Sequence, residues 1–273
     1  MRNSILITND DGIDSIGLKF LAEELNKIGF DIYVVAPKNQ VSGSGKSHSF
    51  EVRVEKRDLQ NAKKSWAIDG KPADAIAIAI RHLLKDVDIK LVVSGINIGP
   101  NMGLMDFFTS GTIGGALEGV LFGYKSFAVS FAILRGIKNK EQEDLLKESA
   151  KLTSIIIKDT FDIIMEDPKL DLININFPPT RPIGIKIAKI SWQTNLDVYV
   201  DSNENIFHVM GWSTDDLNSA YNGGDINSDV FFVKKGYVAL TPMCIKCLPD
   251  SLTYYESYEK INNALAKSNI ISV

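Results

Sequence analysis

The sequence of 273 residues contains only 2 cysteines and 3 histidines, and it has no long apolar run. Two cysteines cannot build a disulfide framework, and a chain of this length buries enough surface to fold without one. A membrane-spanning helix needs roughly 18 or more uninterrupted apolar residues, which no segment provides. Disorder is excluded as well, because 45% of the residues are hydrophobic. We therefore expect a soluble globular protein with one large or two modest domains.

A strong charge of one sign is also absent, since 34 acidic residues stand against 30 basic ones and the net charge is −4. No global basic field exists to hold a polyanion, so we expect no nucleic-acid polymer as a partner. The N-terminus runs directly into an apolar strand pattern at residues 4–8 and lacks the features of a signal peptide. The sequence predicts a cytoplasmic protein with no membrane partner.

The two cysteines, Cys244 and Cys247, have the Cys-x-x-Cys spacing of redox and zinc sites. No second pair exists, and the only histidines are His48, His82 and His208. Because a zinc site would need further ligands, we interpret the pair as two incidental thiols.

Apolar runs alternate with helical patterns through most of the chain. Strands are expected at residues 4–8, 31–36, 89–94, 126–130 and 171–176, and helices at 18–25, 74–84, 110–122 and about 144–159. This alternation is typical of a parallel sheet with helices on both faces. The sequence therefore predicts an α/β fold with a mostly parallel sheet.

The pattern changes after Pro182 to short alternating strands separated by Asn, Asp and Gly clusters. Strands are expected at 184–190, 196–200, 206–210, 230–233 and 237–241, followed by an amphipathic helix at 252–266. Aromatic residues here, among them Trp192, Trp212 and Tyr221, suit either core packing or an arm buried by a partner. We expect a core at 1–182 and, at 183–273, a β-rich extension with a returning strand and a terminal helix.

Ligands of open parallel sheets bind outside the carboxyl ends of the strands, so the loops that follow strands are the first candidates for a site. The first of them holds Asn9-Asp10-Asp11-Gly12. Two adjacent carboxylates repel one another unless they are solvated or share a cation, and Gly12 lets the backbone turn so that both face one point. From the pair alone, a solvated turn or helix cap stays open beside a metal site.

The second loop, residues 37–47, ends in Gly45-Lys46-Ser47, which matches the end of a phosphate-binding P-loop. The motif needs Gly five residues before Gly45, where this chain has Gln40, and no strong helix pattern follows. A P-loop kinase centred on Lys46 is therefore a minor alternative, and by itself the loop is a surface loop rich in hydroxyl groups.

The third loop, residues 94–103, is followed by Ser110-Gly111-Thr112 at the start of a helix. Ser110 is a natural N-cap, and the free N–H groups with the helix dipole make an anion site. The small residues Gly114 and Gly115 serve either close packing or close approach of a phosphate.

Together these loops offer oxygen donors from Asp10, Asp11, Ser42 and Asn97. Such donors select a hard cation such as Mg²⁺ or Mn²⁺. An anion pocket beside the cation suits phosphoryl chemistry.

Several segments, in matching order and spacing, resemble the SurE family of survival-protein nucleotidases. They are Asn9-Asp10-Asp11-Gly12, Ala36-Pro37 with Ser42-Gly43, Gly70-Lys71-Pro72-Ala73-Asp74, residues 94–103, Ser110-Gly111-Thr112 with Glu118-Gly119, and residues 236–242. The resemblance implies a Rossmann-like core with a β-hairpin arm that assembles homodimers or homotetramers. It also implies a phosphomonoesterase that uses one divalent metal ion per subunit, Mg or Mn, on nucleoside 5′- and 3′-monophosphates and on short polyphosphate.

Carried over position by position, the resemblance assigns the metal to Asp10, Asp11, Ser42 and Asn97. It assigns the phosphate of the substrate to Asn101, Ser110, Gly111 and Thr112. Catalysis then falls to Asp10, Asp11 and Asn101, with attack by a metal-activated water that Asp10 or Asp11 orients or deprotonates. An aspartyl-phosphate on Asp10 is the alternative.

Two loops depart from the family pattern. Residues 13–17 lack the Ala-Pro that usually precedes the glycine, and the stretch from Asn101 to Ser110 is one residue longer, with Thr109 where Tyr is common. These departures keep a second reading open, namely a non-catalytic nucleotide-binding module that uses the same anion pocket.

Overall fold

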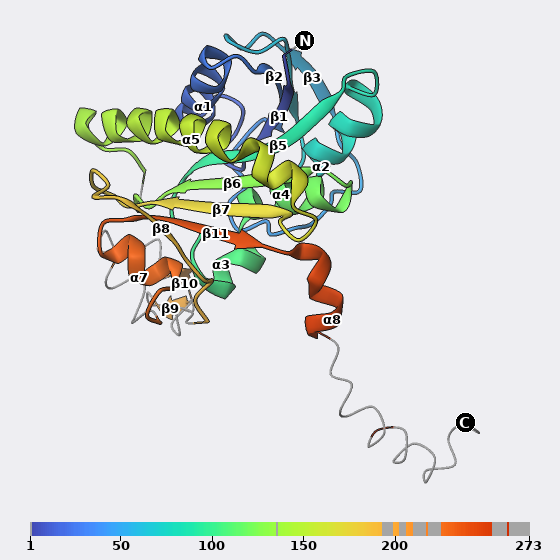
Figure 1. Cartoon of the computed structure of the whole chain (residues 1–273). Helices are drawn as coiled ribbons and strands as arrows, with labels where there is room; N and C mark the ends of the chain where they lie inside the picture. The colour runs from blue at the N-terminus through green and yellow to red at the C-terminus, as the bar shows by residue number, and fades with distance from the viewer. Residues whose placement is uncertain are drawn as a thin grey trace.

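The computed structural model describes residues 2–134, 136–192, 199–201, 206–209, 217, 225–252 and 261. Their centre is a nine-stranded sheet in the order β3-β4-β2-β1-β5-β6-β7-β11-β8 (Figure 1). Its strands are β1 (Ser4–Thr8), β2 (Asp31–Pro37), β3 (Val54–Arg57), β4 (Lys64–Ile68), β5 (Ile89–Ile98), β6 (Lys125–Phe131), β7 (Leu172–Phe177), β8 (Ile185–Ile187) and β11 (Val238–Met243). Only the pairs β3–β4 and β7–β11 are antiparallel, which confirms the predicted mostly parallel sheet.

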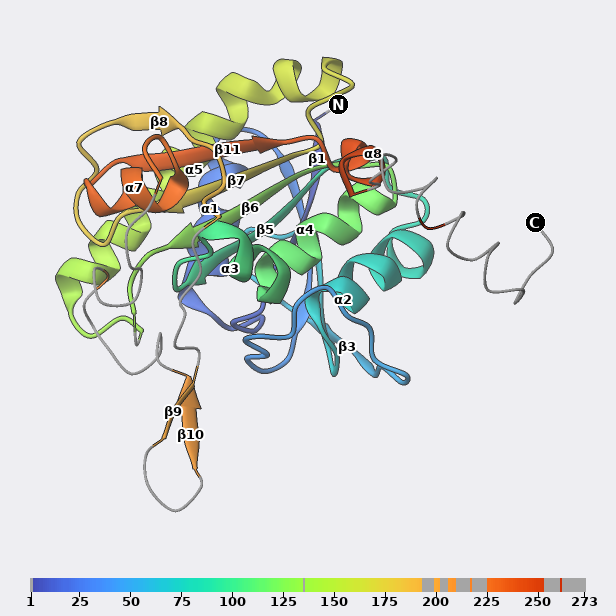
Figure 2. The ribbon, with the colours of Figure 1, turned by 90° about the horizontal axis from the view of Figure 1, so that it is seen from below.

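Helices cover both faces of this sheet, as predicted. On one face α1 (Ile16–Lys27) packs against α5 (Lys140–Glu166), and on the other α2 (Pro72–Ile78) packs against α4 (Gly111–Leu121) (Figures 1 and 2). Every residue of β1 is buried, as expected for a central parallel strand with an unbroken apolar sequence. Further helical elements in the described part of the chain include a π-helical turn (Ala79–Leu83), α3 (Gly103–Thr109), α7 (Asp229–Lys234), a 3-10 turn (Ile245–Cys247) and α8 (Leu248–Leu252).

Several elements differ from the sequence-based expectation, among them β4 and α8, for which no strand or helix was expected at these positions. The predicted strand at 230–233 is wrong, because these residues belong to α7, where the Ser228 side chain accepts the Phe231 N–H and caps the helix. Helix α3 lies in a stretch for which no helix was expected. Strand β3 was not predicted either, since its four residues are all exposed and carry no apolar alternation.

The extension expected at residues 183–273 provides strands of the main sheet and also a second, separate pair of strands. β11 pairs with β7 and β8 pairs with β11, whereas β9 (Tyr199–Asp201) and β10 (Phe207–Val209) form a separate antiparallel pair that projects from the body (Figure 2). Outside the described residues lie Trp212, Tyr221, parts of the strands expected at 196–200 and 206–210, and most of the helix expected at 252–266.

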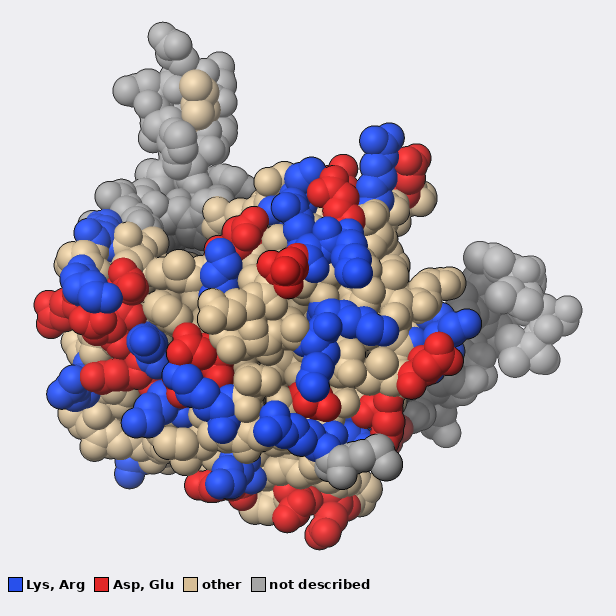
Figure 3. Space-filling model, turned by 90° about the horizontal axis from the view of Figure 1, so that it is seen from above, with Lys and Arg blue, Asp and Glu red and all other residues tan. Residues whose placement is uncertain are grey.

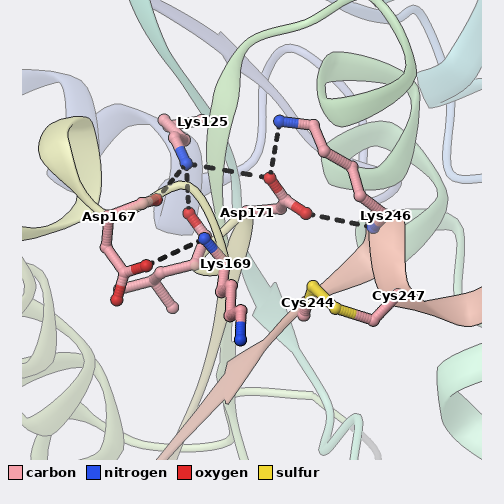
Figure 4. Close-up of a disulfide and its surroundings, with 8 residues drawn as sticks. Lys125, Asp167, Lys169, Asp171, Cys244, Lys246 and Cys247 are labelled. Atoms are coloured by element: carbon pink, nitrogen blue, oxygen red, sulfur yellow. Dashed lines mark hydrogen bonds and ion pairs between the residues drawn. A yellow bond between two sulfur atoms is a disulfide. The ribbon is translucent and has the colours of Figure 1, made fainter.

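Cys244 and Cys247 form a disulfide, so the interpretation as incidental thiols is wrong (Figure 4). The 3-10 turn after β11 brings their Cα atoms to 5.3 Å, a normal separation for a bridge. Buried Asp171 holds this turn by accepting the Lys246 N–H at 3.1 Å. Because β11 runs antiparallel to β7, its end lies at the amino edge of the parallel strands, away from the loops singled out above.

No helix in the described part of the chain is long and apolar enough to cross a membrane. Basic and acidic side chains are interspersed over the face seen in Figure 3, without a basic surface on that face that would suit a polyanion.

Candidate active site

The predicted loops meet at the carboxyl ends of three adjacent strands, because β1 lies between β2 and β5. The chain winds from β1 toward β2 and later crosses to β5 on the other side, so this is a topological switch point, where open α/β sheets bind ligands. Two backbone hydrogen bonds of 2.8 Å join the first two loops, from Val41 to the Asp10 carbonyl and from Ile13 to the Pro37 carbonyl. Gly12, at φ +100°, permits the turn between them.

Asp10 faces the N-terminus of α4. Its side chain is 3% exposed, and Thr112 Oγ1 donates to Oδ1. Burial raises the pKa of Asp10, while hydrogen bonds from Thr112 and Gly111 act in the opposite direction. A Cβ at Gly111 would lie 2.9 Å from Asp10 Oδ2, so only glycine allows this approach. The groups predicted to bind phosphate and the first predicted metal ligand are therefore in direct contact.

Asp11 is the second carboxylate of the pair. Its Oδ2 accepts the Ile98 N–H at 2.8 Å. Burial, and then the charge of Asp10, raise the pKa of Asp11 to about 7. Among the described residues, no Lys, Arg or His forms an ion pair with either carboxylate. A buried and a half-buried acid side by side, without a positive partner, are the situation that a bound cation would relieve.

Ser42 is linked to this pair through Gln40, and Asn97 directly precedes Ile98, whose N–H donates to Asp11. Gln40 Nε2 donates to Ser42 Oγ at 2.9 Å and lies 3.4 Å from Asp11 Oδ1, so it connects the two side chains. The Nδ2 of the Asn97 side chain donates to the Gly99 carbonyl at 2.9 Å. Its Oδ1 is then the atom suited to a cation. Gln40 was noticed in the sequence only as a mismatch to the P-loop.

The donor set fits a hard cation. Within the described ranges, no three His, Cys, Asp or Glu side chains gather into a metal site. A metal at this place would therefore combine the two carboxylates with hydroxyl and amide oxygens and keep several waters, as Mg²⁺ does.

Ser110 is the N-cap of α4, as predicted, and its Oγ accepts the Ile113 N–H at 3.2 Å. The helix has 11 residues, which supports a dipole at its N-terminus. A Cβ would lie 2.5 Å from the Gly45 carbonyl oxygen at Gly114, and 2.8 Å from Thr8 Cγ2 at Gly115. Both glycines thus serve close packing.

Asn101 is 7% exposed and is held by a network that the sequence analysis missed. Its Nδ2 donates to Ser130 Oγ at 2.8 Å, and its carbonyl oxygen accepts from the side chains of Asn174 and Asn176, each at 2.9 Å. Buried Asp229 accepts the N–H of nearby Gly103 at 2.9 Å, and burial raises the pKa of Asp229. The sequence did carry one signal of this network, since two asparagines stand within the apolar run that forms β7, a strand buried throughout.

The loop containing Lys46 does not form a P-loop. It leads to the edge strand β3 rather than to a helix, and Lys46 Nζ pairs with Glu118 Oε2 at 2.7 Å. The fold and site together define an α/β protein with a candidate metal and phosphate site at its switch point.

The family follows from comparison with known proteins. The family model described as "Survival protein SurE" matches residues 5–197. The chain therefore belongs to the SurE family.

Two curated relatives and one solved structure match nearly the whole chain. The protein named 5′-nucleotidase SurE from Pelotomaculum thermopropionicum is 32% identical over 274 residues, covering 98% of this chain and 97% of that protein. The protein of the same name from Campylobacter jejuni subsp. jejuni is 36% identical over 265 residues, with coverages of 96% and 97%. The crystal structure of the SurE protein from Aquifex aeolicus has a TM-score of 0.74 at 27% identity and covers 96% of this chain and 99% of that one.

Proposed function

We propose that the protein is a 5′-nucleotidase, a divalent-metal-dependent phosphomonoesterase that hydrolyses nucleoside monophosphates. The observation that carries this proposal is the adjacent pair of buried Asp10 and half-buried Asp11, which lacks a positive partner among the described residues and contacts the N-terminus of α4 through Asp10. The names of the relatives, matched over nearly their full length, point to the same activity. Nucleoside 3′-monophosphates and short polyphosphate are further substrates in this proposal.

One metal ion per subunit, Mg²⁺ or Mn²⁺, is the proposed cofactor, held by Asp10, Asp11, Ser42 and Asn97. When bound, such an ion polarises a phosphate oxygen and lowers the pKa of a water molecule. The donor atoms that support this assignment are linked by Gln40 and by the N–H of Ile98.

The chain's own residues then bind and orient the substrate. Ser110, Gly111, Thr112 and Asn101 hold the phosphate and stabilise the charge that develops on its oxygens. Asp10 or Asp11 orients the attacking water and accepts its proton. The new bond joins the water oxygen to phosphorus, the ester bond breaks, and the leaving nucleoside oxygen takes up the proton that the aspartate accepted, which gives an alcohol and inorganic phosphate.

Phosphate release from metal-stripped protein tests the proposal. With Mg²⁺ or Mn²⁺ added back, we expect release from a panel of nucleoside 5′- and 3′-monophosphates. Asp10→Asn should reduce turnover more than about 100-fold, since even residues behind a metal ligand contribute 10–100-fold. Asp14→Asn is the matched control, because Asp14 lies in the same loop with its side chain 76% exposed.

Nucleotide binding without metal-dependent release of phosphate would overturn the proposed enzymatic activity and favour the non-catalytic nucleotide-binding module. A phosphorylated Asp10 trapped during turnover would replace water attack by the aspartyl-phosphate route.

The proposal includes assembly into a homodimer or homotetramer and action in the cytoplasm. The family resemblance supports the assembly, and a sedimentation coefficient of a monomer that does not change with dilution would contradict it. The cytoplasmic location stays a prediction from the sequence.

A further inference from the structure

The loop after β2, residues 38–49, is called the Ser42 loop here, and two of its side chains contact buried carboxylates on two helices. Lys46 Nζ lies 2.7 Å from Glu118 Oε2 in α4, and His48 Nδ1 lies 3.1 Å from Asp74 Oδ1 in α2. Both carboxylates belong to residues that are 4% exposed. Because a buried carboxylate without a partner is costly, these contacts tie the loop to the helices.

Lys46 and His48 also contact each other, since Lys46 Nζ lies 3.3 Å from His48 Nε2. A carboxylate only accepts, so His48 can donate to Asp74 from Nδ1, while its Nε2 lies 3.3 Å from Lys46 Nζ and 3.4 Å from Glu118 Oε1. Asp74 also accepts the Ser49 N–H at 3.0 Å. One connected network therefore joins the Ser42 loop to α2 and α4.

This network lies beside the candidate active site. The Gly45 N–H donates to the Thr109 carbonyl at 2.8 Å, just before α4 begins. Ser44 Oγ lies 2.6 Å from where a Cβ on Gly111 would be, and Gly111 is also the residue that approaches Asp10. The middle of the loop is thus packed on the first turn of α4.

We propose that Lys46 and His48 are positioning residues that together clamp the Ser42 loop onto α2 and α4 and so keep Ser42 directed toward Asp11. The inference rests on the proposed function, in which Ser42 supplies a metal ligand. Gln40 links Ser42 to Asp11 on one side of the loop, and the clamp fixes the other side. Without the clamp the loop populates arrangements that do not bind metal, and the apparent affinity falls with the competent fraction.

Binding of Mn²⁺ by isothermal titration calorimetry and amide hydrogen exchange of residues 42–47 test the clamp in the full chain. If the competent fraction falls to about a tenth, Lys46→Met binds Mn²⁺ about tenfold more weakly. Exchange in the loop should become faster. Lys38→Met is the matched control, because Lys38 begins the same loop but pairs with Glu55 at the exposed surface, where an ion pair contributes little.

A double variant tests whether Lys46 acts through its contact with Glu118. If Lys46 acts through Glu118, the Lys46→Met, Glu118→Gln variant weakens Mn²⁺ binding no more than Lys46→Met alone. Unchanged Mn²⁺ affinity in Lys46→Met and His48→Leu would overturn the inference, with or without faster exchange. Should the wild-type protein bind no Mn²⁺, the proposed function fails and the positioning role with it, while exchange still reports whether the clamp holds the loop.

Discussion

At the scale of single residues, Asp10 and Asp11 work against the stability of the fold. Asp10 is buried and Asp11 half-buried, and the raised pKa of each means that the folded chain disfavours the charged form. A structural role would not require two adjacent acids with raised pKa values, whereas the proposed cation site would. Function and stability are therefore opposed at this pair.

Replacing Asp11 by Asn should stabilise the metal-free protein at alkaline pH. The pKa of Asp11 is raised from 3.8 to about 7 in the folded state. The folded state thus holds the proton more tightly than the unfolded state. The resulting contribution of this carboxyl group to the free energy of unfolding is complete below the pKa of the unfolded state and is lost as the pH rises through 7. Asn stays neutral and keeps an acceptor for the Ile98 N–H. We expect a gain of roughly 2–4 kcal/mol at pH 8 that disappears toward pH 4.

Urea unfolding in a chelator at pH 4, 6 and 8 measures this difference, with Asp14→Asn as the exposed control. Equal stability of the wild type and Asp11→Asn at every pH would show that Asp11 is ionised without cost in the folded chain.

The motif residues could be predicted because they directly follow apolar strands, as Asp10 and Asp11 follow residues 4–8. The supporting residues could not. The Asn176 side chain contacts Asn101 across 75 positions, and Gln40 reaches Asp11 across 29. Such contacts depend on the order of strands in the sheet, which no local pattern contains.

At the scale of elements, local signals decided what could be predicted. Ser110 before a helical pattern predicted the start of α4, and its cap is confirmed. The apolar run at 230–233 has the composition of a strand, but the cap from Ser228 and the buried Asp229 start a helix there. Whether such an apolar run forms a strand or a helix therefore depends on the residues that flank it.

The contact of α1 with β5 yields a prediction at this scale. A Cβ at Gly17 would lie 2.2 Å from the carbonyl oxygen of Ile96, which directly precedes Asn97. Gly17→Ala gains about 1 kcal/mol of helix propensity. The backbone clash outweighs this gain, and we expect a net loss of roughly 1–3 kcal/mol.

Thermal unfolding measures the loss, and Gly184→Ala is the control, because its Cβ would meet Tyr237 at an ordinary 3.4 Å. An unchanged midpoint for Gly17→Ala would mean that α1 can move from β5 without loss.

At the scale of the whole molecule, the sheet order places the three loops of the site at one point. β1 is central, and its neighbours β2 and β5 extend the sheet in opposite directions. The sequence predicted the parallel sheet and the loops, and the inspection of strand ends succeeded because of this switch point. The strand order itself required the structure, as did the return of β11 to pair with β7.

Metal binding at this point should stabilise the entire fold. A ligand that binds only the folded state adds about 2.7 kcal/mol at 100 times its dissociation constant. At the proposed site Mn²⁺ would also relieve the repulsion between Asp10 and Asp11, because both carboxylates would then face a positive charge. For a chain of this size each kcal/mol raises the unfolding midpoint by about 2–4 °C. We therefore expect a rise of several degrees with Mn²⁺ in differential scanning calorimetry, retained in Asp14→Asn and absent in Asp10→Asn. An equal rise in Asp10→Asn would place the bound metal elsewhere on the molecule.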